Sequence, residues 1–156
     1  MAYHRFNKLL EETGRLMDIP GLCCDEEGFC AVVPGDDIQF NMQPIHESSN
    51  LLIYTEIATP EPECLDHLGP ILLVWNMDEE RLGHGSLGLL GETVILFFNM
   101  EYRTLDGGKF YAFFQRSVEC VKNLRMEIGQ ICHDLHQNSS GVYHGELPLP
   151  DYAVRI

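Results

Sequence analysis

The sequence lacks a hydrophobic run long enough to cross a membrane. Its longest apolar stretches, ILLVW and VILFF, are five residues each, whereas a transmembrane helix needs about 20. The first ten residues, MAYHRFNKLL, contain no apolar run of signal-peptide length. We therefore expect no membrane insertion and a cytoplasmic protein, whose cysteines stay reduced in that compartment.

Basic residues are scarce. Ten lysines and arginines face 24 aspartates and glutamates, which gives a formal net charge of −14. Nucleic acids and anionic membrane surfaces are polyanions and would repel such a protein. Neither is therefore expected as a partner, and the charge favours solubility and partners that are neutral or basic.

The signatures of common catalytic and cofactor sites are also absent. The sequence contains no P-loop, no G-x-G-x-x-G and no G-x-S-x-G. Ser86 lies in the stretch GHGSLG close to His84, but its spacing does not fit a nucleophile elbow, and the start of a glycine-rich hairpin explains it more simply. His133, Asp134 and His136 could in principle hold a metal, yet histidines near a helix C-terminus are favoured by the helix dipole alone. We expect no enzyme, no cofactor and no metal site.

The six cysteines form no recognisable metal or redox motif. Zinc sites typically use C-x₂-C pairs, whereas Cys23 and Cys24 are adjacent in GLCCDEEGFC and would point to opposite faces of a strand. Cys30 lies across a turn. Cys120 and Cys132 fall at apolar positions of a C-terminal helix, where a thiol behaves as a small hydrophobe. Structural thiols are therefore favoured, with a small metal or redox protein as the weaker alternative.

The spacing of apolar residues predicts three helices. Intervals of three and four recur over residues 3–17 and from Phe110 to Leu135, which indicates a first helix and a long last helix with Asp106 as its N-cap. Between them, TPEPECLDHLGPILLVWNM has helical spacing, with Pro70 expected to kink it or divide it into two short pieces.

Short extended runs bounded by turn residues predict the strands. LCCD, FCAVV, DIQFNM and LLIYTEIA are typical of an antiparallel meander, and LGLLGETVILFF of a hairpin that turns at Gly91-Glu92. The fold class is therefore α+β: a helix, a three-strand meander, a helix, a two-strand hairpin and a long helix, with the helices packed on a twisted antiparallel sheet. We expect one domain over residues 1–136 and an irregular tail over residues 137–156.

The order and spacing of these segments resemble the class I type III secretion chaperones, the Tir-chaperone-like family. FNKLLEETGRLMDIP resembles the first helix of the family, DEEGFCAVVPGDDIQFNM its Asp-x-x-Gly turn and following strands, ILLVWNM the end of its second helix, and LDGGKFYAFFQRSVECV the opening of its last helix. The resemblance covers about Phe6 to Leu135. No single one of these motifs is specific, since all are turns and apolar patterns.

The resemblance implies a homodimer in the bacterial cytoplasm that performs no catalysis. Such chaperones bind the N-terminal segment of secreted effector proteins and hold it extended and competent for secretion, with the secretion ATPase as a further partner. Apolar grooves and an exposed strand edge are surfaces suited to this task. The alternative is a non-catalytic regulator of the same fold that acts through protein contacts.

Two surfaces follow from these patterns. The resemblance places the dimer interface on the second helix and the next strand, at Leu72, Trp75, Leu87 and Leu89. Both segments are also apolar on more than one face, which is typical of elements that are covered on all sides. For the partner we predict a platform on the first helix and the early strands. One apolar face of each element must also close the core, so each platform residue could belong either to the core or to a groove on the surface. The platform residues are Phe6, Leu10, Met17, Phe29, Val33 and Phe40.

Overall fold

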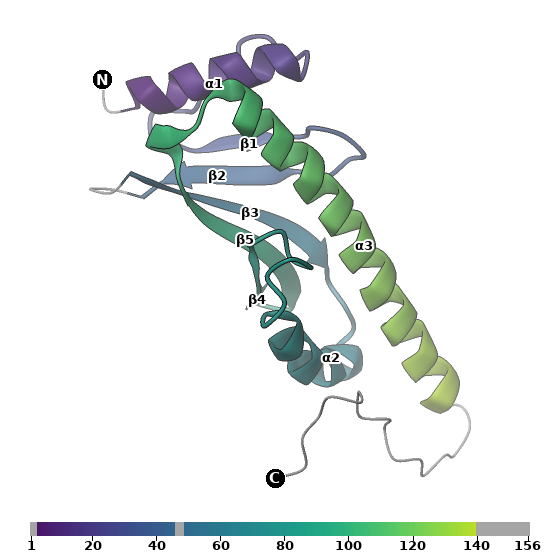
Figure 1. The fold of residues 1–156 in the computed structure, drawn as a ribbon. Helices are drawn as coiled ribbons and strands as arrows, with labels where there is room; N and C mark the ends of the chain where they lie inside the picture. The colour runs from purple at the N-terminus through teal and green to yellow at the C-terminus, as the bar shows by residue number, and fades with distance from the viewer. Residues whose placement is uncertain (1–2, 46–48, 140–156) are drawn as a thin grey trace.

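The computed structural model describes residues 3–45 and 49–139 of the chain. Over these residues it forms an α+β fold, as the apolar patterns predict (Figure 1). The elements in chain order are α1 (His4–Leu16), β1 (Cys30–Val32), β2 (Phe40–Pro44), β3 (Asn50–Ala58), α2 (Pro62–Trp75), β4 (Ser86–Leu90), β5 (Thr93–Glu101), the 3₁₀ turn η1 (Tyr102–Thr104) and α3 (Gly107–Ser139).

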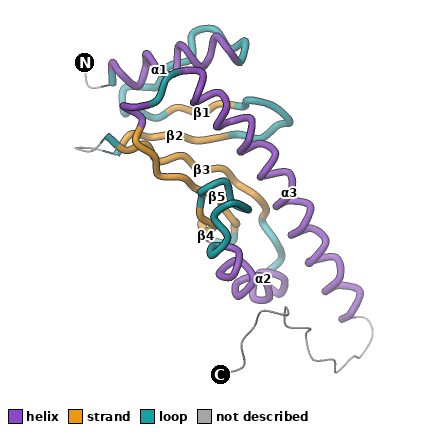
Figure 2. The backbone as a smooth tube through the Cα atoms, viewed as in Figure 1, coloured by secondary structure: helices purple, strands orange, loops and turns teal. Residues whose placement is uncertain are grey.

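The strands form one antiparallel sheet in the order β1-β2-β3-β5-β4. The two nine-residue strands, β3 and β5, lie in its centre, and the edges are β1 and β4. Figures 1 and 2 show α3 running diagonally across one face of the sheet, with α1 at the β1 end and α2 at the β4 end. The fold therefore places α1 and α2 at opposite ends of α3.

The core lies between α3, α1 and one face of the sheet. Along β3, alternate residues point into it and are buried, as expected for a strand with one covered face. Aromatic rings from the first turns of α3 fix that helix on the sheet: the ring centroids of Phe114 and Phe40 are 5.3 Å apart, and those of Phe113 and Phe98 are 4.9 Å apart, both pairs edge to face.

The start of α3 confirms the predicted N-cap. The Asp106 carboxylate accepts a hydrogen bond from the backbone N–H of Lys109 at 2.8 Å, and this bond is the main cause that lowers the pKa of Asp106. Gly107 follows where α3 crosses α1. A Cβ on Gly107 would lie 2.6 Å from the Cβ of Glu12, so a larger residue would force the two helices apart.

The segment LCCD is not a strand, so that prediction was wrong. The backbone N–H of Cys24 donates to the Asn7 side chain of α1 at 2.9 Å, and Gly21 and Gly28 adopt positive φ values of 77° and 85°. The Asp25 carboxylate closes the next turn by accepting the N–H of Phe29 at 2.8 Å. The segment thus follows α1 rather than the sheet.

Of the two outcomes expected at Pro70, the division into two short pieces does not occur. Helix α2 is one element that contains the proline. Leu68 and Leu72 flank the proline and are both buried. Their packing stabilises the helix at the point where proline, which has no backbone N–H, cannot donate a hydrogen bond. Helix α3 continues to Ser139, past the predicted domain end at residue 136. The rest of the predicted tail, residues 140–156, lies outside the described residues.

Candidate partner-binding surfaces

Three of the predicted platform residues belong to the core. Phe6, Leu10 and Phe40 have no exposed surface. Phe6 packs edge to face on Tyr102, with ring centroids 5.7 Å apart, and Phe40 packs on Phe114 in the same way. The single apolar stripe of α1 is used to close the core, so these side chains are not available to a partner on the surface of the chain.

The other platform residues retain exposed surface. Met17 and Phe29 are partly buried, while Val33, just after β1, is 47% exposed. Leu16, the last residue of α1, is 51% exposed and was not predicted as a contact. Exposed apolar side chains therefore remain at the end of α1 and beside β1.

A groove runs along the outer side of α1. It has a volume of about 710 Å³ and lies between that helix and the segment that follows it. Three basic residues from α1 line it, His4, Lys8 and Arg15, and Arg15 forms an ion pair with Glu11. We call this feature the α1 groove. Its lining residues are His4, Asn7, Lys8, Glu11, Arg15, Pro20, Gly21, Leu22 and Cys23.

A second apolar surface lies on α2 and β4. Two leucines of β4, two residues in the last turn of α2 and Met77 just after that helix are exposed, and α2 contacts β4 directly. Large apolar groups that stay exposed on neighbouring elements are typical of interaction sites. We call them the α2–β4 patch: Leu73 (70% exposed), Val74 (42%), Met77 (85%), Leu89 (50%) and Leu90 (59%).

The patch only partly coincides with the residues predicted for the dimer interface. Leu89 is in the patch, whereas Leu72 and Leu87 are each 5% exposed and pack in the core. Trp75 is partly buried, and the guanidinium of Arg81 lies 4.3 Å from its ring centroid. Within the single chain, Leu89 is therefore available to a second copy, whereas Leu72 and Leu87 are used by the core, and the dimer interface stays a prediction. Since α2 is apolar on several faces, periodicity alone could not separate Leu72 from Leu73.

Asn76 joins the two elements that carry the patch. Its side-chain oxygen accepts the backbone N–H of Leu87 at 2.6 Å, and its side-chain NH₂ donates to the Leu87 carbonyl at 3.0 Å. The amide therefore satisfies the backbone N–H and carbonyl of Leu87, on the side of β4 that faces away from β5. This pair of hydrogen bonds fixes the end of α2 against the edge strand.

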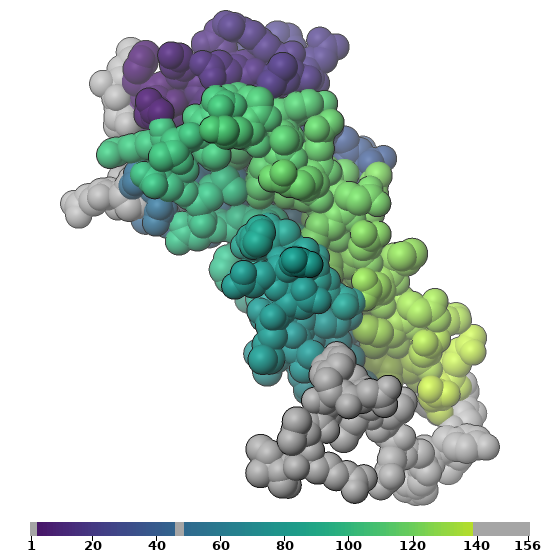
Figure 3. Space-filling view, viewed as in Figure 1, coloured from purple at the N-terminus to yellow at the C-terminus, as the bar shows by residue number. Residues whose placement is uncertain are grey.

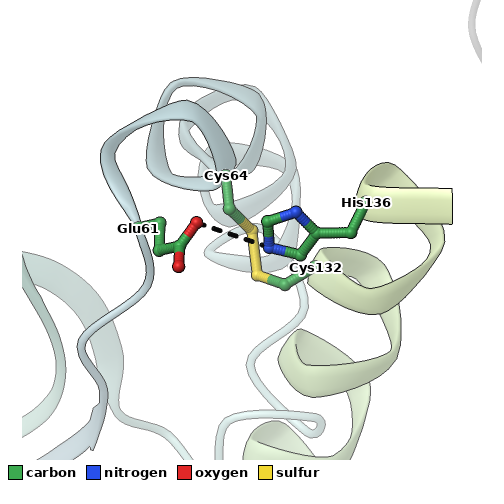
Figure 4. The surroundings of a disulfide bond; sticks show 4 residues. All are labelled: Glu61, Cys64, Cys132 and His136. Atoms are coloured by element: carbon green, nitrogen blue, oxygen red, sulfur yellow. Dashed lines mark ion pairs between the residues drawn. A yellow bond between two sulfur atoms is a disulfide. The ribbon is translucent and has the colours of Figure 1, made fainter. Parts of the chain in front are cut away.

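The cysteines differ from the prediction at one pair. Cys64 of α2 and Cys132 of α3 form a disulfide with a Cα–Cα distance of 5.6 Å (Figure 4), so the expectation that Cys132 is a free thiol was wrong. Of the others, Cys30 is buried, which raises its pKa to about 12, and Cys23 is exposed. Over residues 3–45 and 49–139, no cluster of His, Cys, Asp and Glu side chains is suited to hold a metal ion, and no helix has the length and apolar character to cross a membrane.

The fold is that of known secretion chaperones. One chain of the HopA1–SchA chaperone–effector complex matches with a TM-score of 0.67 at 16% identity, covering 81% of this chain and 97% of that one. A chain of the ExsC–ExsE complex matches with a TM-score of 0.64 at 17% identity, covering 78% and 92%. The complex of the Yersinia pestis type III secretion chaperone SycH with a fragment of YscM2 matches with a TM-score of 0.58 at 19% identity, covering 76% and 98%.

The sequence identifies the family. The profile of the Tir chaperone protein (CesT) family matches residues 8–125, from the first helix into the last. The chain therefore belongs to the Tir chaperone protein (CesT) family, which confirms the resemblance stated above. No curated protein sequence matches the chain.

Proposed function

We propose that this protein is a non-catalytic chaperone of type III secretion that binds the N-terminal segment of one or more secreted effector proteins and holds it extended. The observation that carries this proposal is the family match over residues 8–125. The structures of similar fold add support, because they include a chaperone bound to its effector. We place this activity in the bacterial cytoplasm, with the secretion ATPase as a further partner.

The effector segment binds, in this proposal, along the α1 groove and the exposed residues next to it. An extended segment loses chain entropy when it becomes ordered, so it needs several apolar anchor points. Leu16 and Val33 supply exposed apolar surface at the end of α1 and beside β1. The net charge of −14 adds long-range attraction for basic segments, with an association rate that falls as salt rises.

Glutamate at Val33 tests this surface. Because Val33 is 47% exposed, Val33→Glu should fold and yet weaken capture of the N-terminal segments of effectors from the same secretion system. Asn123→Glu, on the exposed side of α3, is the matched control and should bind as the parent does. Equal capture by the parent and by folded Val33→Glu and Leu16→Glu would show that effectors bind elsewhere.

The chain also acts as a homodimer in this proposal, through the α2–β4 patch. Leu73 and Met77 are 70% and 85% exposed in the single chain, an arrangement that is costly in water unless another surface covers it. Strand β4 is a sheet edge, and edge strands are suited to pairing with a second copy. Both features support a two-fold interface built from α2 and β4.

Light scattering tests the dimer. The parent should give a dimer mass at micromolar concentration, and the double variant Leu73→Glu, Met77→Glu should give a monomer with unchanged circular dichroism, because neither side chain supports the core. Leu16→Glu, which changes an exposed apolar residue away from the patch, should stay dimeric. A monomeric parent would contradict the interface without bearing on the α1 groove.

A further inference from the structure

The disulfide joins two helices that are far apart in sequence. Cys64 lies in the first turn of α2 and Cys132 near the end of α3, at a separation of 68 residues. Cys64 is 3% exposed, whereas Cys132 is only partly buried. Cys132 is therefore the more accessible residue of the pair.

A small cavity opens beside the two sulfurs. It has a volume of about 110 Å³ and is lined by Glu63, Cys64, Cys132, Leu135 and His136. A volume of this size admits a few water-sized groups, such as the sulfur end of a small thiol, but no protein loop. Figure 4 shows the His136 ring beside the disulfide.

The first and last turns of α2 are held by different contacts. At the start of the helix, two contacts connect α2 to α3: the disulfide, and the N-cap residue Glu61, whose Oε2 lies 3.5 Å from His136 Nε2 and forms an ion pair when that histidine is protonated (Figure 4). At the last turn, Asn76 connects α2 to β4 through its two bonds with Leu87. A change in the disulfide therefore acts on one end of the helix and spares the end that carries the patch.

We propose that Cys64–Cys132 is a redox-active site that exchanges with low-molecular-weight thiols and their disulfides, and that its oxidation state sets how firmly the first turn of α2 is held on α3. In the oxidised protein the helix is tied at both ends. In the reduced protein the first turn opens more readily, while Asn76 keeps the last turn in place.

The exchange balances as a two-electron reaction. A small thiolate attacks the sulfur of Cys132, the protein disulfide breaks, and Cys64 leaves as a thiolate that takes a proton from water. A second small thiolate attacks the small molecule's own sulfur in the mixed disulfide, which releases Cys132 as a thiolate that is protonated in turn. Two thiols have become one small disulfide, and their two electrons have reduced the protein pair. Oxidation is the reverse, with the small disulfide as oxidant.

Glutathione buffers test the site on the full-length protein. The protein is equilibrated at stepped ratios of reduced to oxidised glutathione, its free thiols are alkylated, and the peptides containing Cys64 and Cys132 are measured by mass spectrometry. The pair should interconvert while circular dichroism stays native. On reduction, hydrogen exchange should accelerate in the first turns of α2 and in the part of α3 around Cys132, and stay constant in β3 and β5.

Matched variants separate this pair from the other cysteines. Cys64→Ser and Cys132→Ser should each reproduce the exchange pattern of the reduced parent in both buffers, whereas Cys23→Ser should retain the redox response, since Cys23 is a free, exposed thiol away from the pair. If a serine variant fails to fold, the reduced parent supplies the same comparison.

The proposal is overturned by any of three results. The pair could be reduced only at the rate of global unfolding, which would make it a structural cross-link. Oxidised glutathione could fail to form the Cys64–Cys132 bond in the folded protein. Hydrogen exchange of α2 could be the same in both redox states.

Discussion

Removing the Asn76 amide should destabilise the protein by about 2–3 kcal/mol. Asn76→Ala deletes both hydrogen bonds to Leu87. The backbone N–H and carbonyl of Leu87 then lose their partner, and Leu87 is only 5% exposed. Each lost bond costs about 1 kcal/mol net, and more where the remaining group stays buried. The backbone of Asn76 has φ −65° and ψ −12°, which alanine adopts freely, so the loss arises from the side chain.

Urea unfolding followed by circular dichroism measures this loss at one fixed protein concentration, since association changes apparent stability. Asn123→Ala is the control, because the same substitution on an exposed helix position should change stability by no more than about 0.5 kcal/mol. Asn76→Asp adds a second comparison. Aspartate has nearly the same shape and keeps the oxygen that accepts the Leu87 N–H. Its second carboxylate oxygen faces the Leu87 carbonyl, and two acceptors repel each other, so this variant should not restore the parent stability.

The reasoning fails if Asn76→Ala and Asn123→Ala lose the same stability. It also fails if Asn76→Asp is as stable as the parent, because the donated bond to the Leu87 carbonyl would then contribute nothing. A loss in Asn76→Ala with hydrogen exchange raised only in β1 and β2 would place the effect away from the contact between α2 and β4.

Three further outcomes are expected. In native protein at neutral pH, iodoacetamide should modify Cys23 and leave Cys30 unmodified, because burial raises the pKa of Cys30 to about 12; peptide mapping that finds both modified equally fast would contradict this. Phe40→Glu should give little folded protein because it buries a charge in the core, whereas the same change at exposed Val33 should be tolerated. Circular dichroism distinguishes the two variants. A native spectrum for Phe40→Glu would disprove the assignment of Phe40 to the core. Asp106→Ala should lower stability at neutral pH. The folded-state pKa of Asp106 is lowered from 3.8, so the contribution of this carboxylate to stability is present above that pH and is lost as pH falls through the folded pKa. The stabilities of the parent and Asp106→Ala should therefore converge in acid unfolding curves. A gap that stays constant would refute the cap.

Local patterns were sufficient to predict the elements whose determinants lie close together in sequence. Helix α1 differs from the predicted range by one residue at each end, because its apolar stripe and the turn after it are both local. Asp106 caps α3 as predicted, since capping involves only the next three residues. The hairpin turns at Gly91, where φ is 62°, a conformation that glycine adopts without strain.

The remaining features depend on contacts distant in sequence. LCCD has the composition of a strand, but the side chain that satisfies Cys24 belongs to Asn7, 17 residues earlier. The disulfide joins residues 68 positions apart, and no spacing rule connects them. An apolar stripe also looks the same whether it meets the core or a partner, so Phe6 and Leu10 could be placed only once their neighbours were known.

The length of α3 determines which segments can contact both ends of the molecule. Gly107 meets α1 and Cys132 meets α2, and the roughly 25 residues between them extend about 38 Å along a straight helix. An extended peptide covers about 3.3 Å per residue, so it needs at least about 12 residues to run parallel to α3 from one end to the other. Shorter peptides can occupy the α1 groove or the region of α2, but they cannot bridge the two.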